Sequence, residues 1–156
     1  MSEPLFFATY KVYINHTDAG GIVYHANHLT FFENCRRDWL ASLGFDGYFF
    51  NQTKEGLQES IHFVVSRANI CYKQPLLIDD KLIVSIDRLT INAASLVVEQ
   101  SIYRNHDDFA ANKSASAATI TLACVCHQQT GMRPHRLPAA LLLVLTKHHQ
   151  IKTNCN

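Results

Sequence analysis

The residues with the clearest chemical potential lie in one short segment near the N-terminus. Asp18 is followed by the glycine pair Gly20 and Gly21, and the glycines precede a long amphipathic run that begins near Tyr24. The run predicts a helix, whose first backbone N–H groups lack intrahelical acceptors and carry the positive end of the helix dipole. Such donors polarise a carbonyl oxygen, and a nearby carboxylate activates water or attacks the carbonyl carbon. The segment therefore predicts a site for chemistry on an ester-type carbonyl.

The same residues also allow a purely structural interpretation. An aspartate shortly before a glycine often forms an Asx-turn, in which the carboxylate only accepts a neighbouring backbone N–H. Gly20 and Gly21 would then only make the turn, rather than let the backbone approach a ligand closely. Residue chemistry alone favours this structural interpretation for Asp18, so a more specific signal is needed.

A long helix must position the donors. Its predicted bounds are Tyr24 and Leu43, which make it roughly 30 Å long. Gly44 stands where a left-handed C-terminal cap is expected. The apolar stripe consists of Leu29, Phe32, Trp39, Leu40 and Leu43, whereas Glu33, Arg36, Arg37 and Asp38 lie mostly off it. A helix of this length and pattern is typical of a core element with a sheet folded around it.

The rest of the chain predicts strands with short connections. The β-rich segments are 5–14, 61–73, 81–91, 96–103 and 114–127. Residues 45–60 have the composition of turns and a short helix, 105–108 predict a turn, and 139–147 predict a short helix before a loose tail. The order predicts an α+β fold, with an antiparallel sheet curled on one long helix. We expect one domain over 1–138 and an appended segment over 139–156.

Composition excludes several classes of function. The chain has 156 residues and a formal net charge of +1, which gives no bulk attraction to nucleic acid or acidic membranes. The longest apolar run, 139–145, is too short to span a membrane. The N-terminus has neither a basic n-region nor a long apolar core, so we do not expect it to be a signal peptide. The cysteines are odd in number and show no disulfide or metal spacing: Cys35, Cys71, Cys124, Cys126 and Cys155. We expect reduced thiols, a cytoplasmic protein and a small-molecule partner.

Residues 16–28 read His-Thr-Asp-Ala-Gly-Gly-Ile-Val-Tyr-His-Ala-Asn-His. With Phe31-Phe32-Glu33 and Trp39-Leu40, they closely resemble the signature of the hotdog-fold 4-hydroxybenzoyl-CoA thioesterase superfamily, and in particular its YbgC-type acyl-CoA thioesterases. The resemblance continues through Phe63-Val64-Val65, Tyr72, Pro75, Asp79-Asp80 and Arg133-Pro134, and covers most of the chain up to about residue 138. The Leu-rich segment after that point matches no motif of the family.

The resemblance implies a hotdog fold, a homodimer or a dimer of dimers (a homotetramer), and hydrolysis of acyl-CoA to a free acid and CoA without a metal or other cofactor. The family's catalytic acid falls on Asp18, and its carbonyl-polarising backbone N–H falls at His25. Because the family's site lies between subunits, the partner is expected to supply part of it. The expected substrate-binding residues are Gly20, Gly21, Tyr24, Val64, Val65, Ser66 and Arg67.

Several roles stay open at this point. Asp18 acts either as a general base toward water or as a nucleophile, and His25 acts through its backbone alone or also through its side chain. Tyr24 either packs or contacts substrate, and Cys35 is expected to be buried rather than nucleophilic. His16, His25 and His28 lack a further ligand at metal-binding spacing. The candidates for binding the phosphates of CoA are Arg67, Lys73, Arg88, Arg133 and Arg136.

Two rival functions remain. A hotdog enoyl-thioester hydratase or dehydratase pairs an aspartate with a histidine side chain at shorter spacing than that between Asp18 and His25. A non-catalytic module would hold an acyl thioester, or an acyl carrier protein, without turning it over. The sequence leaves the acyl group open, as well as the choice between CoA and acyl carrier protein.

Overall fold

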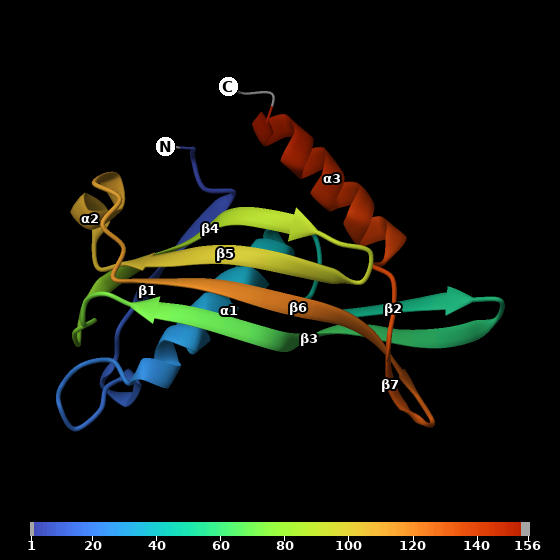
Figure 1. Cartoon of the computed structure of the whole chain (residues 1–156), viewed down its shortest axis with the longest axis horizontal. Coiled ribbons are helices and arrows are strands. Elements are labelled where there is room, and N and C mark those ends of the chain that lie inside the picture. Colours follow the sequence, from blue (N-terminus) through green and yellow to red (C-terminus); the bar gives the residue numbers. More distant parts are fainter. Residues whose placement is uncertain (1, 154–156) are drawn as a thin grey trace.

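The structure of the chain is a computed structural model that describes residues 2–153. A long helix, α1 (His25–Ser42), lies against one face of a seven-stranded sheet (Figure 1). The strands pair in the order β1-β4-β5-β6-β3-β2, with β7 on β6, and every pairing is antiparallel. Their bounds are β1 (Phe6–Lys11), β2 (Phe49–Lys54), β3 (Leu57–Tyr72), β4 (Lys81–Ile91), β5 (Ser95–Tyr103), β6 (Ser116–Gln128) and β7 (Gly131–Pro134). The predicted α+β architecture is confirmed.

The core lies between α1 and the inner face of the sheet. Alternate residues of β5 and β6 point inward, as a strand with one buried face requires. The helix contributes Phe31, Phe32, Trp39 and Leu40, all of them at most 2% exposed. Burying a side chain of this kind stabilises the fold by about 1.5–3 kcal/mol. This packing holds α1 in one position against the sheet.

The ends of α1 agree with the prediction to within one residue. Tyr24 is the N-cap and Leu43 the C-cap. Gly44 follows with φ +93°, and its N–H donates to the Ala41 carbonyl at 3.0 Å. This is the left-handed conformation expected of the glycine that ends a helix.

Arg36 is placed differently from the sequence prediction. It is only 3% exposed, although the helical pattern put it mostly off the buried stripe. Its Nε donates to the Tyr48 hydroxyl at 2.7 Å, and its Nη1 donates to Gln100 Oε1 at 2.9 Å. Two neutral acceptors therefore make burial of the guanidinium possible, and helical periodicity alone does not show them.

Most of residues 45–60 lie in strands, so the prediction of turns and a short helix is wrong for this segment. They include β2, which forms a hairpin with β3 (Figure 1). The two residues that join these strands, Glu55 and Gly56, have φ +51° and +77°. Positive φ at both positions is typical of the tight turns that join antiparallel strands.

The other differences are at element ends. The first strand stops at Lys11, before a 3₁₀ turn at Ile14–His16. Asn105 caps a short helix, α2 (His106–Ala110), where only a turn was expected. The prediction contained no β7, and α3 (Ala139–Thr153) extends beyond the expected residue 147. The last three residues of the predicted loose tail, 154–156, lie outside the described residues.

Two general expectations can be compared with residues 2–153. The cysteines within this range, Cys35, Cys71, Cys124 and Cys126, are free thiols, and Cys155 lies beyond it. The helices of this part of the chain are all too short or too polar to span a membrane.

Candidate active site

Asp18 is held beside α1 by a short antiparallel turn. The Tyr24 N–H donates to the His16 carbonyl at 3.0 Å, and the Asp18 N–H donates to the Ile22 carbonyl at 2.9 Å. The chain thus reverses over 18–22 and enters the helix immediately afterwards. This pairing places Asp18 two residues along the turn from the His16–Tyr24 pair, where the chain enters α1.

The turn is also fixed to the rest of the molecule. The Val23 N–H donates to the Leu76 carbonyl at 2.9 Å, and the Val23 side chain is buried. From the first turn of α1, Asn27 Nδ2 donates to the His16 carbonyl at 2.8 Å. These contacts hold the turn in one place relative to the helix, which is what a catalytic carboxylate needs.

The Asp18 carboxylate forms the predicted Asx-turn and keeps a free oxygen. Its Oδ1 accepts the Gly20 N–H at 2.8 Å, whereas Oδ2 has no partner within residues 2–153. The side chain is exposed, and a Cβ at Gly20 would lie 3.1 Å from Oδ1. Gly21 has φ +78°, a conformation that favours glycine. The turn therefore orients the carboxylate and leaves one oxygen available to water or substrate.

The N-terminus of α1 presents unused donors. Tyr24 provides no side-chain cap, and the Asn27 N–H donates to the Tyr24 carbonyl at 2.8 Å. Neither the His25 N–H nor the Ala26 N–H has an acceptor in the described part of the chain. These two groups lie at the positive end of the helix dipole. They can bind the negative oxygen of a developing oxyanion.

Side chains from β3 and β6 contact the first turns of α1. The Tyr72 hydroxyl donates to the His25 carbonyl at 2.8 Å, and its ring meets the His28 ring edge-on with centroids 4.9 Å apart. Buried His28 shares a hydrogen bond of 2.9 Å between its Nδ1 and Ser116 Oγ. Burial, and then the nearby His25, lower the pKa of His28 to about 4. The imidazole of His28 is therefore uncharged at neutral pH.

Known proteins share this arrangement of turn, helix and sheet. Residues 12–145 match the profile of the Thioesterase-like superfamily. The chain belongs to this superfamily. It is 35% identical to the acyl-CoA thioesterase YbgC of Haemophilus influenzae over 117 residues, which are 74% of this chain and 76% of that protein. It is 30% identical to the acyl-CoA thioester hydrolase YbgC of Escherichia coli O6:H1 over 142 residues, 91% of this chain and 96% of that protein.

A probable thioesterase from Bartonella henselae gives the structural counterpart. Its crystal structure aligns with a TM-score of 0.67 and 29% identity, covering 85% of this chain and 97% of that one. The membership confirms the predicted family, the hotdog fold and the enzyme class, a thioester hydrolase. It assigns no role to individual residues.

Within one thioesterase chain the predicted site residues form two groups. Asp18, Gly20, Gly21, Tyr24 and His25 lie together on the turn and the helix tip. The second group, Val64, Val65, Ser66 and Arg67, belongs to β3. Val65 lines a cavity together with Leu29, Thr30, Glu33 and Arg36 of α1. Within residues 2–153 no hydrogen bond or ion pair joins the side chains of the two groups.

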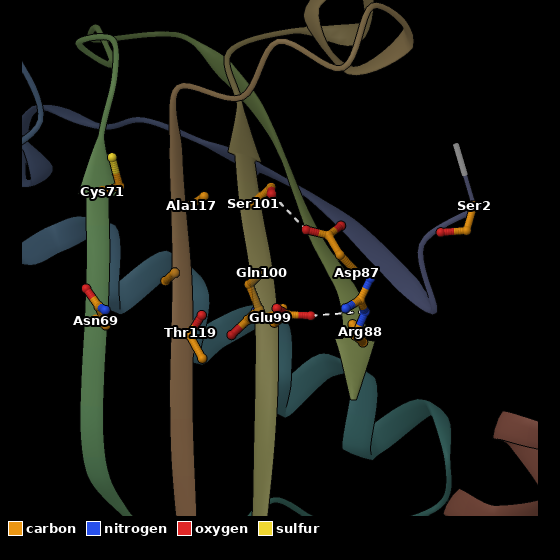
Figure 2. Close-up of a pocket in the computed structure, with 11 residues that line it drawn as sticks. Ser2, Asn69, Cys71, Asp87, Arg88, Glu99, Gln100, Ser101, Ala117 and Thr119 are labelled. Carbon is orange, nitrogen blue, oxygen red and sulfur yellow. Dashed lines mark hydrogen bonds and ion pairs between the residues drawn. The ribbon is translucent and has the colours of Figure 1, made fainter. Parts of the chain in front are cut away.

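Two of the cationic candidates lie beside cavities on the face of the sheet opposite α1. Arg88 forms an ion pair with Glu99 at 3.2 Å. Both line a cavity of about 410 Å³ on that face, and Figure 2 shows the residues that line it. Lys73, which follows β3, donates to Ser114 Oγ at 2.9 Å and lines a neighbouring cavity that shares Asp87 and Ser101 with the first. Arg88 and Lys73 are therefore poor candidates for binding a substrate at the tip of α1.

Two other features considered from the sequence are a metal site and the thiol of Cys35. No group of three metal-binding side chains occurs in the part of the chain that the structure describes. Burial raises the pKa of the Cys35 thiol to about 12, and its Sγ donates to the Val84 carbonyl at 3.3 Å. Sequence reasoning missed the contact of Tyr72 with His25 and that of Ser116 with His28. These partners are 47 and 88 residues apart, and no local pattern signals such contacts.

Proposed function

We propose that the chain is an acyl-CoA thioesterase that hydrolyses an acyl-CoA to the free acid and CoA, with Asp18 and His25 as its catalytic residues. The observation that carries this proposal is an exposed carboxylate on a fixed turn that leads directly into a helix whose first two N–H groups lack acceptors within residues 2–153. The printed names of the two YbgC relatives support acyl-CoA as the substrate class. The free thiols among the described cysteines are consistent with a location in the cytoplasm.

In the proposed reaction the thioester carbonyl oxygen accepts the His25 N–H. Water attacks the carbonyl carbon and gives a proton to Asp18 Oδ2, and the backbone donor stabilises the resulting oxyanion. The oxyanion then collapses, the C–S bond breaks, and the leaving thiolate of CoA takes up the proton that Asp18 accepted, which regenerates the carboxylate. Removing one such donor in other enzymes costs about 3–4 kcal/mol of barrier. The exposed imidazole of His25 is a second candidate for donating a proton to the leaving thiolate.

A covalent route uses the same residue. Asp18 would attack the carbonyl carbon, expel the thiolate and form a mixed anhydride, which water then hydrolyses. A single turnover in ¹⁸O-labelled water separates the routes. Only attack of water on the aspartyl carbon of the anhydride places a solvent oxygen in the Asp18 carboxylate.

We further propose that the site is completed by a second copy of the chain, in a homodimer or a dimer of dimers. Residues 57–62 of β3 pair with β2, but residues 64–72 pair only with β6 within residues 2–153. An unpaired strand edge of this length is a template for another strand. The register shift between Val65 and Arg67 adds a local irregularity, a feature common beside active sites. A partner's residues 64–67 would supply the second group of substrate-binding residues, Val64, Val65, Ser66 and Arg67.

Two further parts of the proposal concern the substrate and the domain. Arg67, Arg133 and Arg136 are the candidate ligands for the phosphates of CoA, and acyl carrier protein is a second possible carrier. Residues 1–138 form the proposed catalytic domain. Leu141 and Leu145 of α3 are buried in the same core, which supports a structural role for the appended helix.

The proposal is tested by a thiol-release assay across a panel of acyl-CoAs that spans short aliphatic, aromatic and long acyl chains. Hydrolysis of at least one class well above background is the expected result. Crotonyl-CoA is included because addition of water without release of thiol would instead identify a hydratase. Tight binding of acyl-CoA without hydrolysis across the panel would identify a non-catalytic binding module.

A further inference from the structure

A second cavity lies between the middle of α1 and the sheet. It has a volume of about 260 Å³. Apolar side chains from both layers form much of its wall: Leu29 from α1, Val65 and Ala68 from β3, and Ile120 from β6. The polar residues that line it, Thr30, Glu33 and Arg36, all come from the helix. The cavity thus combines an apolar wall with one buried cation.

Arg36 carries a charge that the protein does not neutralise directly. Within residues 2–153 no carboxylate lies at ion-pair distance from its guanidinium. The nearest acid along the helix face, Glu33, instead pairs with Arg37 at 3.1 Å. Buried charges in proteins are normally paired, because an uncompensated one is costly. An anion bound beside Arg36 would therefore compensate a buried positive charge.

One nitrogen of Arg36 remains available. Its hydrogen bonds use Nε, toward Tyr48, and Nη1, toward Gln100. The fully enclosed side-chain N and O atoms that lack a partner in the described residues are Trp39 Nε1 and His62 Nδ1. Nη2 of Arg36 also lacks a partner but is not enclosed, so it meets open space. The open space that Arg36 lines is this cavity.

We propose that this cavity binds the far end of the acyl group and that Arg36 binds a carboxylate there. Arg36 lies eleven residues, about 16 Å of helix rise, beyond His25, so the preferred substrates are CoA thioesters of medium-chain dicarboxylic acids. Leu29, which lines the cavity, is one helical turn beyond His25, so an acyl group whose carbonyl meets the His25 N–H extends along α1 into the cavity. The apolar wall contacts its methylene groups, and Nη2 donates to its terminal carboxylate. This inference rests on the proposed thioesterase function.

The test compares thioesters of matched chain length. Suberyl-, sebacyl- and dodecanedioyl-CoA are set against octanoyl-, decanoyl- and dodecanoyl-CoA. We expect a kcat/KM at least tenfold higher for the carboxylate-ended member of the best pair. Arg36→Met should remove this preference by lowering the value for the dicarboxylic substrate alone, and Arg36→Lys should retain part of it. Lys113→Met, which changes an exposed cation that does not line the cavity, should leave the preference intact. A wild-type preference for the methyl-ended series would overturn the proposal.

A binding measurement keeps the test independent of catalysis and of the stability of the Arg36 variants. Calorimetry on Asp18→Asn protein gives the Kd of sebacyl-CoA and of decanoyl-CoA with Arg36 in place. Tighter binding of sebacyl-CoA, by tenfold or more, supports the carboxylate site, and equal or weaker binding refutes it. If wild-type protein hydrolyses no thioester but this binding preference holds, the proposed function fails and the carboxylate site stands.

Discussion

The Tyr72 hydroxyl donates a hydrogen bond of 2.8 Å to the backbone carbonyl of His25. It joins the last residue of β3 to the first residue of α1. The helix tip carries the proposed oxyanion donors, so this bond connects their orientation directly to the sheet. The edge-on contact between Tyr72 and His28 adds a second attachment one turn further along.

Tyr72→Phe should lower kcat with little change in KM. The substitution removes only the hydroxyl, and a hydrogen bond of this kind contributes about 0.5–1.5 kcal/mol. If that energy orients the donors in the transition state, kcat falls by roughly 2–10-fold. Steady-state thiol release measures the effect, with Tyr13→Phe as the control at an exposed tyrosine. A rise in KM at unchanged kcat would assign Tyr72 to substrate binding instead.

Gly20→Ala should reduce activity more than stability. The new Cβ would lie 3.1 Å from Asp18 Oδ1, so the carboxylate has to move by a few tenths of an ångström. Displacements of about 1 Å in a catalytic group can cost 100-fold, and we expect roughly a tenfold loss here. Gly44→Ala is the matched control. At φ +93° and with nothing near its Cβ, it should cost about 1 kcal/mol of stability but no activity per folded molecule. Equal activity of the two variants would contradict the assigned role of the Asp18 turn.

The free energy of unfolding should depend on pH through His28. Its pKa in the folded protein is about 4, below the ordinary value of 6.5, so the unfolded chain takes up the proton first as the pH falls. The full stability is present above pH 6.5 and is lost progressively toward pH 4, by up to about 3 kcal/mol. Denaturant unfolding at several pH values should show a shallower loss for His28→Phe than for wild type or for His127→Gln, a variant at an exposed histidine. Parallel curves for all three proteins would rule out this contribution.

The free edge of β3 predicts an assembly larger than the 17.7 kDa chain. Light scattering should give twice or four times this mass, and activity per chain should fall on dilution below the dissociation constant. Amide hydrogen exchange offers a local check, because the amides of 64–72 that point away from β6 should exchange slowly only where a partner strand covers them. A monomer with full activity would contradict the shared site.

The sequence predicts some parts of this site better than others, depending on the range of the contacts. The Asp18 turn and the start of α1 lie within ten residues of each other, so local turn chemistry and helical periodicity are enough to place both. The support from Tyr72 and Ser116 depends on which strands pair beside the helix, and a single sequence does not show this.

The differences in the fold have the same origin. Arg36 follows a surface-like helical pattern, yet it is buried because Tyr48 and Gln100, from distant segments, accept its hydrogen bonds. The 45–60 segment contains two glycines and several polar residues that suggest turns, but the pairing of β2 with β3 makes it part of a hairpin. Tertiary partners outweigh local composition in both places.

The most direct test of the central claim is the rate of thiol release by Asp18→Asn protein on the best acyl-CoA of the panel. The substitution keeps the shape of the side chain and an Oδ1 acceptor for the Gly20 N–H but removes the charge. We predict a loss of kcat of at least about 100-fold with an unchanged thermal unfolding curve. Asp46→Asn, at an exposed aspartate outside the site, should keep the wild-type rate. Wild-type activity in Asp18→Asn protein would contradict the account.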